Sequence, residues 1–149
     1  MGTPYSKVYE KALFRFRDYS LPALDEVDVG NILKVYLNST VSDFGGICKE
    51  SLLADTEVDD SFKDDLSDEV QEILALGISF YWLSSQVLNE DLLKNSLSTK
   101  DYTYFSPANL LRESQSLRDA VRKEYRDKMN LYTYRHGDIA SLSVESANV

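Results

Sequence analysis

The chain has 149 residues, of which 43% are hydrophobic and 28% charged, and its formal net charge is −9. A chain of this length fits one domain, which can bury a core without disulfide or metal staples. Cys48 is the only cysteine and His136 the only histidine, which excludes an internal disulfide and a zinc site built from several such residues. The longest apolar patch, 73–83, is interrupted by Gly77 and is too short to span a bilayer, so we expect no membrane segment.

Charge is distributed unevenly along the sequence. Residues 20–111 carry 17 acidic against five basic side chains, whereas residues 112–135 carry seven basic against four acidic ones. An acidic body is poorly suited to nonspecific binding of nucleic acid, which requires clustered cations. The simpler interpretation of the imbalance is solubility. The alternative is contact between the acidic and basic faces of neighbouring subunits.

Two segments in the first third of the chain predict helices. Thr3-Pro4 is a typical helix start, a hydroxyl cap followed by proline at the first helical position, so we expect a helix over 4–17. A second helix is expected over 28–44, with Asp28 as its cap. The Gly45-Gly46 pair that follows ends it.

An acidic segment follows these helices. Residues 49–66 have low apolar content, and nine acids with one lysine lie between Asp55 and Glu72. Such a cluster suggests calcium, but an EF-hand starting at Asp55 would have Asp60 at its sixth position and Leu66 at its twelfth. Glycine and glutamate are required there. The segment is therefore interpreted as a solvated acidic loop.

The most apolar part of the chain predicts the buried centre of the fold. Ser67 can cap a helix over about 67–88 whose apolar residues cover nearly all of its faces, and such a helix is buried by its neighbours. Tyr81 and Trp82 each have a polar atom that needs a partner, so we expect one of them to reach the edge of the helix. A short further helix is expected to restart at Asn89.

Ser106-Pro107 repeats the start signal of the first helix and predicts a long helix over 107–135. Such a helix would be about 43 Å long, more than the width of roughly 38 Å of a compact globule of this size. Its end must reach the rim of the domain or project, and we expect Tyr132 and Tyr134 to be displayed there. Residues 138–149 are small and polar and are expected to form a flexible arm. The inner face of the helix recurs at steps of three and four: Leu110, Leu111, Leu117, Val121, Tyr125, Met129 and Tyr132.

The sequence offers no arrangement typical of an enzyme. A Ser-His-Asp set would have to use His136, which lies at a helix end beside the expected arm, a poor place to hold geometry. Neither a GxGxxG nor a GxxxxGK[ST] loop is present, so no phosphate cradle can be proposed. Glu69 and Glu72 can share a helix face, but paired acids also occur on ordinary solvated helices. We therefore expect a protein without catalytic activity, cofactor or metal.

Together these elements predict an all-α fold, a helical bundle of about four to five helices. It has a buried central helix, a long C-terminal helix and an extended C-terminal tail. Residues 1–137 are expected to form a single α-helical domain that includes the acidic loop 49–66. Residues 138–149 are expected to be the flexible C-terminal arm.

This order of elements resembles the small α-helical head–tail connector, or adaptor, proteins of tailed bacteriophages. The resemblance covers roughly 4–137 and includes the buried stretch Ile78-Ser79-Phe80-Tyr81-Trp82-Leu83 and the stretch Ser98-Thr99-Lys100-Asp101-Tyr102. It implies a structural protein of the virion neck, present in the host cytoplasm during assembly. Copies of the chain would form a ring, often of twelve, under the portal protein. The ring would join capsid to tail and contact the next neck or tail-completion protein, and DNA would pass through its lumen without specific binding.

The partner-binding residues expected on this basis lie in the aromatic corner, at the end of the long helix and in the arm: Tyr102, Tyr104, Phe105, Tyr132, Tyr134, Arg135, Ile139, Leu142 and Val144. The simpler interpretation of the aromatic corner, Tyr102-Thr103-Tyr104-Phe105, is a plug at the end of the bundle, and the alternative is contact between subunits. Two other functions remain open from the sequence. One is a helical regulatory or scaffolding module that binds one partner protein, and the other is an acidic inhibitor that mimics DNA.

Overall fold

The computed structural model describes residues 2–16, 26–96 and 107–137, with the backbone alone for 16, 26–29, 89–96 and 107–111. These residues form four helices, α1 (Tyr5–Phe16), α2 (Glu26–Phe44), α3 (Asp68–Ser96) and α5 (Pro107–His136). The extended pairing among them consists of two isolated bridges, Pro4 to Ser61 and Ala54 to Phe62. The predicted all-α helical bundle is confirmed.

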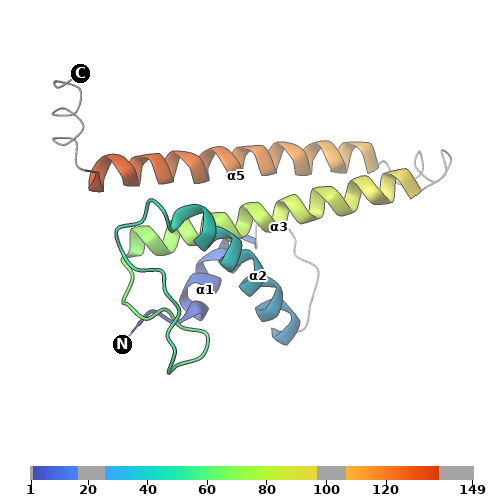
Figure 1. Cartoon of the computed structure of the whole chain (residues 1–149). Helices are drawn as coiled ribbons and strands as arrows, with labels where there is room; N and C mark the ends of the chain where they lie inside the picture. The colour runs from blue at the N-terminus through green and yellow to red at the C-terminus, as the bar shows by residue number, and fades with distance from the viewer. Residues whose placement is uncertain (1, 17–25, 97–106, 138–149) are drawn as a thin grey trace, which may run out of the picture.

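The two longest helices, α3 and α5, lie side by side and run antiparallel (Figure 1). With 29 and 30 residues, each is about 45 Å long. The shorter α1 and α2 pack against the first half of α3, and the end of α2 also contacts α5. The second half of the α3–α5 pair extends beyond them (Figure 1). The fold is thus a long two-helix frame with a small helical layer on one of its halves.

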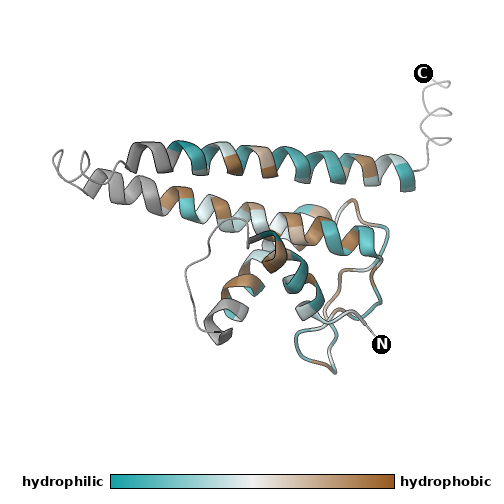
Figure 2. Ribbon diagram, turned by 180° about the vertical axis from the view of Figure 1, so that it is seen from behind, coloured by the Kyte–Doolittle hydropathy of each residue, from teal (hydrophilic) through white to brown (hydrophobic). Residues whose placement is uncertain are grey.

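The core is centred on the N-terminal half of α3, where Ile73 to Ser79 are all buried. A helix that is apolar around its whole circumference needs neighbours on every side, and α1, α2 and α5 all contact α3. Figure 2 shows the contrast with α5, which is mostly hydrophilic, while apolar residues recur along α3. The predicted buried central helix is therefore present.

The inner face predicted for α5 is also confirmed where its side chains are described. Val121, Tyr125 and Tyr132 are buried, and Leu117 and Met129 are half-buried against the core. The aromatic contacts are specific, since the Phe80 and Tyr125 rings stack at 6.3 Å and the Phe44 and Tyr132 rings meet edge-on at 5.1 Å.

The segment between α2 and α3 exposes most of its acidic side chains, but its backbone is held to the N-terminus. Phe62 is 1% exposed and packs edge-on against Tyr5, with ring centroids 4.8 Å apart. The backbone N–H of Thr3 donates to Asp64 O at 3.0 Å, and that of Phe62 donates to Thr3 O at 2.8 Å. The acidic side chains around them are exposed, but the backbone of the loop is part of the folded unit.

Thr3 does not have the role predicted for it. Its Oγ1 accepts the N–H of Leu66 at 2.8 Å and donates to Asp65 Oδ1 at 3.0 Å. Both partners of this hydroxyl lie in the loop between α2 and α3. The first backbone N–H of α1, that of Tyr5, donates to Asp60 O at 2.8 Å. The prediction of a hydroxyl cap was wrong because a distant loop competes for the same side chain.

Two helix boundaries also differ from the prediction. The second helix begins at Glu26, so Asp28 lies within its first turn and is not its cap. The third helix continues without interruption through Asn89 to Ser96, so the expected restart at Asn89 is wrong. Asn89 is a weak signal for the end of a helix, because a single asparagine costs a helix less than about 1 kcal/mol.

Candidate docking site

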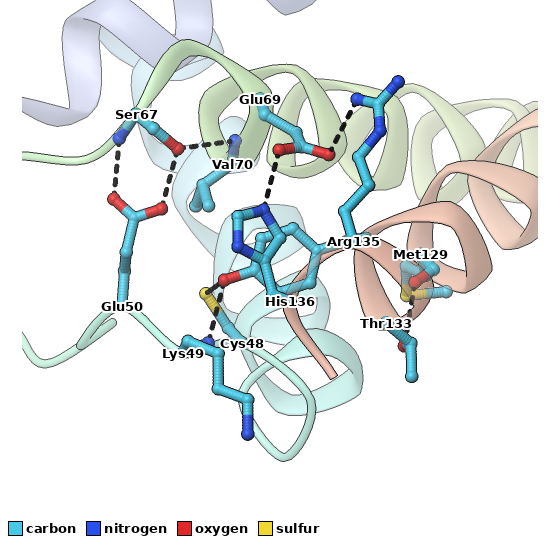
Figure 3. Close-up of polar contacts among 11 residues, drawn as sticks. Cys48, Lys49, Glu50, Ser67, Glu69, Val70, Met129, Thr133, Arg135 and His136 are labelled. Atoms are coloured by element: carbon cyan, nitrogen blue, oxygen red, sulfur yellow. Dashed lines mark hydrogen bonds and ion pairs between the residues drawn. The ribbon is translucent and has the colours of Figure 1, made fainter. Parts of the chain in front are cut away.

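Three segments that are distant in sequence meet at the C-terminal end of α5 (Figure 3). They are the loop that follows α2, the first turn of α3 and the last turn of α5. We call this meeting point the α5 junction and define it by Lys49, Glu50, Glu69, Tyr132 and His136. The chain continues from it into residues 138–149.

Tyr132 is the centre of the α5 junction. Its hydroxyl accepts the backbone N–H of Lys49 at 2.9 Å and lies 3.8 Å from the thiol of Cys48. Burial raises the pKa of the Tyr132 hydroxyl, and this effect outweighs the hydrogen bond from Lys49. The side chain is only 1% exposed, so the prediction that Tyr132 is displayed was wrong. It fixes the loop after α2 to the end of α5.

Glu69 joins the beginning of α3 to the end of α5. Its Oε2 lies 3.0 Å from His136 Nε2, and its Oε1 lies 3.4 Å from an Arg135 guanidinium nitrogen. The His136 ring also stacks on Tyr132, with centroids 4.2 Å apart. An acid in the first turn of one helix and bases in the last turn of the other suit both helix dipoles. Each contact is partly exposed and therefore individually weak.

Glu50 connects the loop to the same end of α3. Its two carboxylate oxygens accept the Ser67 N–H and the Ser67 hydroxyl, each at 2.7 Å. The Ser67 oxygen in turn accepts the N–H of Val70 at 3.4 Å. The prediction that Ser67 caps this helix is confirmed, and Glu50 holds the capping hydroxyl in place.

An open hollow of about 340 Å³ lies beside these contacts, lined in part by Ile47, Lys49 and Thr133. Tyr134 is next to it in sequence and points outward, with 74% of its surface exposed. Arg135 is exposed as well, although its guanidinium also contacts Glu69. The junction thus presents a fixed, polar surface with one large aromatic side chain free for contact.

A second polar cluster ties α2, α3 and α5 together farther along the frame. The hydroxyls of Tyr81 and Tyr125 both donate to Asp43 Oδ2, the latter at 3.3 Å. Burial, reinforced by Asp43, raises the pKa of Tyr81 to about 12. Burial likewise raises the pKa of Tyr125. Tyr81 thus meets the expectation that Tyr81 or Trp82 would reach the edge of its helix.

The acids considered as a catalytic pair have separate structural partners. Glu72 accepts hydrogen bonds from Lys11 and Arg15, each at 3.2 Å. Burial acts to raise the pKa of Glu72, but these cations outweigh it and lower the pKa. Glu69 instead contacts Arg135 and His136 at the α5 junction, so the two carboxylates bind different partners.

Of the predicted partner-binding residues, the structure describes three, all near the end of α5: Tyr132 is buried, whereas Tyr134 and Arg135 are exposed. The other six lie outside the described residues: Tyr102, Tyr104, Phe105, Ile139, Leu142 and Val144. Sequence reasoning missed Asp43, Lys49 and Glu50. No local pattern marks them, since Asp43 and Glu50 act on residues 17 to 82 positions away.

No helix among residues 2–16, 26–96 and 107–137 is long and apolar enough to cross a membrane. In the same ranges, no three His, Cys, Asp or Glu side chains gather closely enough to hold a metal ion.

The fold and the α5 junction define an all-α protein built on two long antiparallel helices, with a polar junction at one end. Comparison with known proteins adds no family, since no protein-family model, no curated protein and no solved structure matches the chain.

Proposed function

We propose that this chain is a structural subunit of the head–tail connector of a tailed bacteriophage, without catalytic activity. In this role copies of the chain form a ring beneath the portal protein, extend the DNA channel and receive the next neck component. The segment 138–149 is the part that binds the portal or a neighbouring subunit.

The α5 junction is the observation that supports this role most directly. An arm that leaves the subunit at a fixed point loses less conformational freedom when it binds a partner. Gly137 follows the last turn of α5, and its N–H donates to Thr133 O at 2.7 Å. His136 beside it is held by Glu69 and Tyr132. The chain therefore enters residues 138–149 from a position fixed by both long helices.

The rest of the frame suits a subunit that transmits load between two partners. The α3–α5 pair spans about 45 Å and is cross-linked to α2 through Asp43. The net charge of −9 disfavours adhesion to DNA, because a phosphate backbone is held by clustered cations.

The direct test removes residues 138–149 and measures binding to a portal protein from the same genome as this chain. Circular dichroism of the truncated protein should keep its helical signal, because α5 ends at His136 and the residues of the α5 junction are all retained. Portal binding should be lost. A full-length Tyr134→Ala variant should weaken binding less than the truncation does.

The control replaces residues 138–149 with a Gly/Ser segment of the same length, which separates the sequence of the arm from its mere presence. Binding that survives both changes would show that the arm is not the portal-binding segment. Electron microscopy of the assembled complex should show rings. A stable monomer that blocks a DNA-binding protein would instead support the DNA-mimic function.

A further inference from the structure

The outer face of α5 carries a ridge of side chains with the composition of a protein interface. Arg118, Arg122, Arg126, Asn130 and Tyr134 follow one another at intervals of four, so they line one gently winding row on the helix. Arginine and tyrosine are the residue types most enriched at binding hot spots, whereas lysine and glutamate are depleted. We call these five residues the α5 ridge.

The two central arginines of the α5 ridge, Arg122 and Arg126, differ from their neighbours in forming no ion pair among the described residues. Arg118 is paired with Asp119 at 3.3 Å, and the adjacent Lys123 with Asp127 at 2.8 Å. Arg122 and Arg126 are exposed and form no ion pair within the part of the chain that the structure describes. They are one turn apart, and each guanidinium is a planar group that can donate two hydrogen bonds to a carboxylate.

A complementary surface lies on the loop between α2 and α3. Leu53 and Val58 are 66% and 56% exposed, which is unusual for two apolar side chains on one short segment. Glu57 and Asp59 are exposed beside Val58 and form no ion pair among the described residues. We call this surface the loop tip and define it by Leu53, Glu57, Val58 and Asp59. It combines exposed apolar side chains with unpaired acids, as interfaces do, and Lys63 lies beside Leu53 and Glu57.

The loop tip is fixed enough to act as a docking element. Asp55 Oδ1 accepts the backbone N–H groups of Glu57 and Val58 at 2.8 and 3.3 Å, which sets the turn. The Asp55 N–H donates to Ser61 O at 2.8 Å, next to the buried Phe62. A preorganised loop loses little conformational entropy when it binds.

The α5 ridge and the loop tip cannot meet within one molecule. In Figures 1 and 2, α5 forms one edge of the molecule, and the part of the α2–α3 loop beside the N-terminal segment lies at the opposite edge. Two different, complementary patches on opposite sides of a subunit give a heterologous contact, which generates rings or filaments.

We propose that the loop tip of one copy binds the α5 ridge of the next. Glu57 and Asp59 face Arg122 and Arg126, and Val58 packs on the ridge between them. The inference deepens the proposed function, because it names the surfaces through which ring subunits would contact each other. The occupant of the α5 ridge is therefore a second copy of this chain, and not a nucleic acid.

Sedimentation velocity of two charge-reversed full-length proteins tests the contact. One carries Arg122→Glu and Arg126→Glu, and the other carries Glu57→Lys and Asp59→Lys. The wild type should associate at about 50 mM salt and dissociate at about 500 mM, where exposed charges are screened. Each variant alone should sediment as a monomer at both salt concentrations. An equal mixture should associate again, because every ridge then meets a loop tip of opposite charge.

The matched control is Lys7→Glu with Lys128→Glu, which changes net charge as much as the ridge variant does but lies outside the α5 ridge. It should associate like the wild type. A wild type that stays monomeric at low salt would overturn the inference, and so would association that survives both reversals. Binding of fluorescent duplex DNA that depends on Arg122 and Arg126 would also overturn it. Portal binding by residues 138–149 does not depend on this contact. The proposed function is therefore tested by a separate measurement, and failure of the contact between copies is distinguishable from failure of the proposed function.

Discussion

Gly77 of α3 lies so close to Thr40 of α2 that no side chain fits between them. A β-carbon at Gly77 would lie 2.2 Å from Thr40 Cγ2 and 2.6 Å from its Oγ1. Thr40 has no room to move away, because it is fully buried and its hydroxyl donates to Tyr36 O at 2.8 Å. The pair therefore sets the distance between the two helices in the centre of the core.

Substituting Gly77→Ala should destabilise the protein even though alanine is the better helix former. The overlap with Thr40 forces a shift of two packed helices, and overpacking of this kind costs about 1–3 kcal/mol. Urea unfolding followed by circular dichroism should show a lower midpoint. Thr40→Ala in the same chain should recover part of the loss, since it removes the two closest atoms.

Gly30 of α2 provides the matched control. A β-carbon there would meet nothing within 4 Å, so Gly30→Ala should stabilise the protein by roughly 0.5–1 kcal/mol through helix propensity. Equal effects of the two substitutions would show that α2 and α3 are not in close contact at Gly77.

The N-terminal segment should contribute to stability through one hydroxyl. Thr3→Val keeps the shape of the side chain but leaves the N–H of Leu66 without its acceptor. An unsatisfied buried donor of this kind costs about 1–3 kcal/mol. Thr3→Ser should be close to wild type because it keeps the oxygen. Thermal unfolding measures both.

Hydrogen exchange provides the local readout for this contact. The amides of Leu66 and Phe62 should lose protection in Thr3→Val, while those of α5 should change much less. Ser6→Ala, an exposed substitution three residues away, should change neither stability nor exchange. Unchanged exchange at Leu66 in Thr3→Val would argue against the contact between the N-terminus and the loop.

The sequence was a good guide wherever a residue acts within its own helix. Hydrophobic spacing predicted the buried α3 and the inner face of α5, and Ser67 was recognised as a cap because the capping geometry spans three residues. The Gly45-Gly46 end of α2 was found for the same reason, since its hydrogen bonds are local.

The α5 junction and the loop could not be predicted, because long-range partners determine them. Thr3 has an ideal capping sequence but bonds to residues more than 60 positions away. Phe62 is a single aromatic residue in an acidic segment, and only its contact with Tyr5 makes it a core residue. Helix length correctly placed the end of α5 at an edge of the fold, but it could not show that Tyr132 turns inward there.

Alkaline pH should weaken the fold through the tyrosines that share Asp43. The folded pKa of Tyr81 is raised from 10.0 to about 12. A raised pKa means that its contribution to stability is complete below pH 10 and is lost as the pH rises toward 12, since the unfolded state ionises first. The midpoint of urea unfolding should fall across this window.

Tyr81→Phe isolates that contribution. It should cost about 1 kcal/mol at neutral pH through the lost hydrogen bond, and its midpoint should fall less steeply than that of the wild type at alkaline pH. Tyr134→Phe changes an exposed tyrosine and should follow the wild-type curve. If the urea midpoint fell in parallel with pH for all three proteins, the Asp43 cluster would be ruled out as the cause of the loss of stability at alkaline pH.

Acid should weaken the fold at the contact between α1 and α3. Lys11 and Arg15 lower the pKa of Glu72 below its ordinary value. A lowered pKa means that the contribution is present above the ordinary value of about 4.3 and is lost as the pH falls through the folded value. The side chain of Glu72 is 41% exposed, so the contribution is small, within about 1 kcal/mol.

Glu72→Gln should therefore be less stable than the wild type at neutral pH, and the difference should vanish at low pH. High salt should shrink the difference as well, because the three charges are partly exposed. Glu113→Gln removes an exposed acid that has no ion pair in the described part of the chain and should show no such dependence. A Glu72→Gln deficit that stays constant from neutral to acidic pH would assign the effect to packing instead of charge.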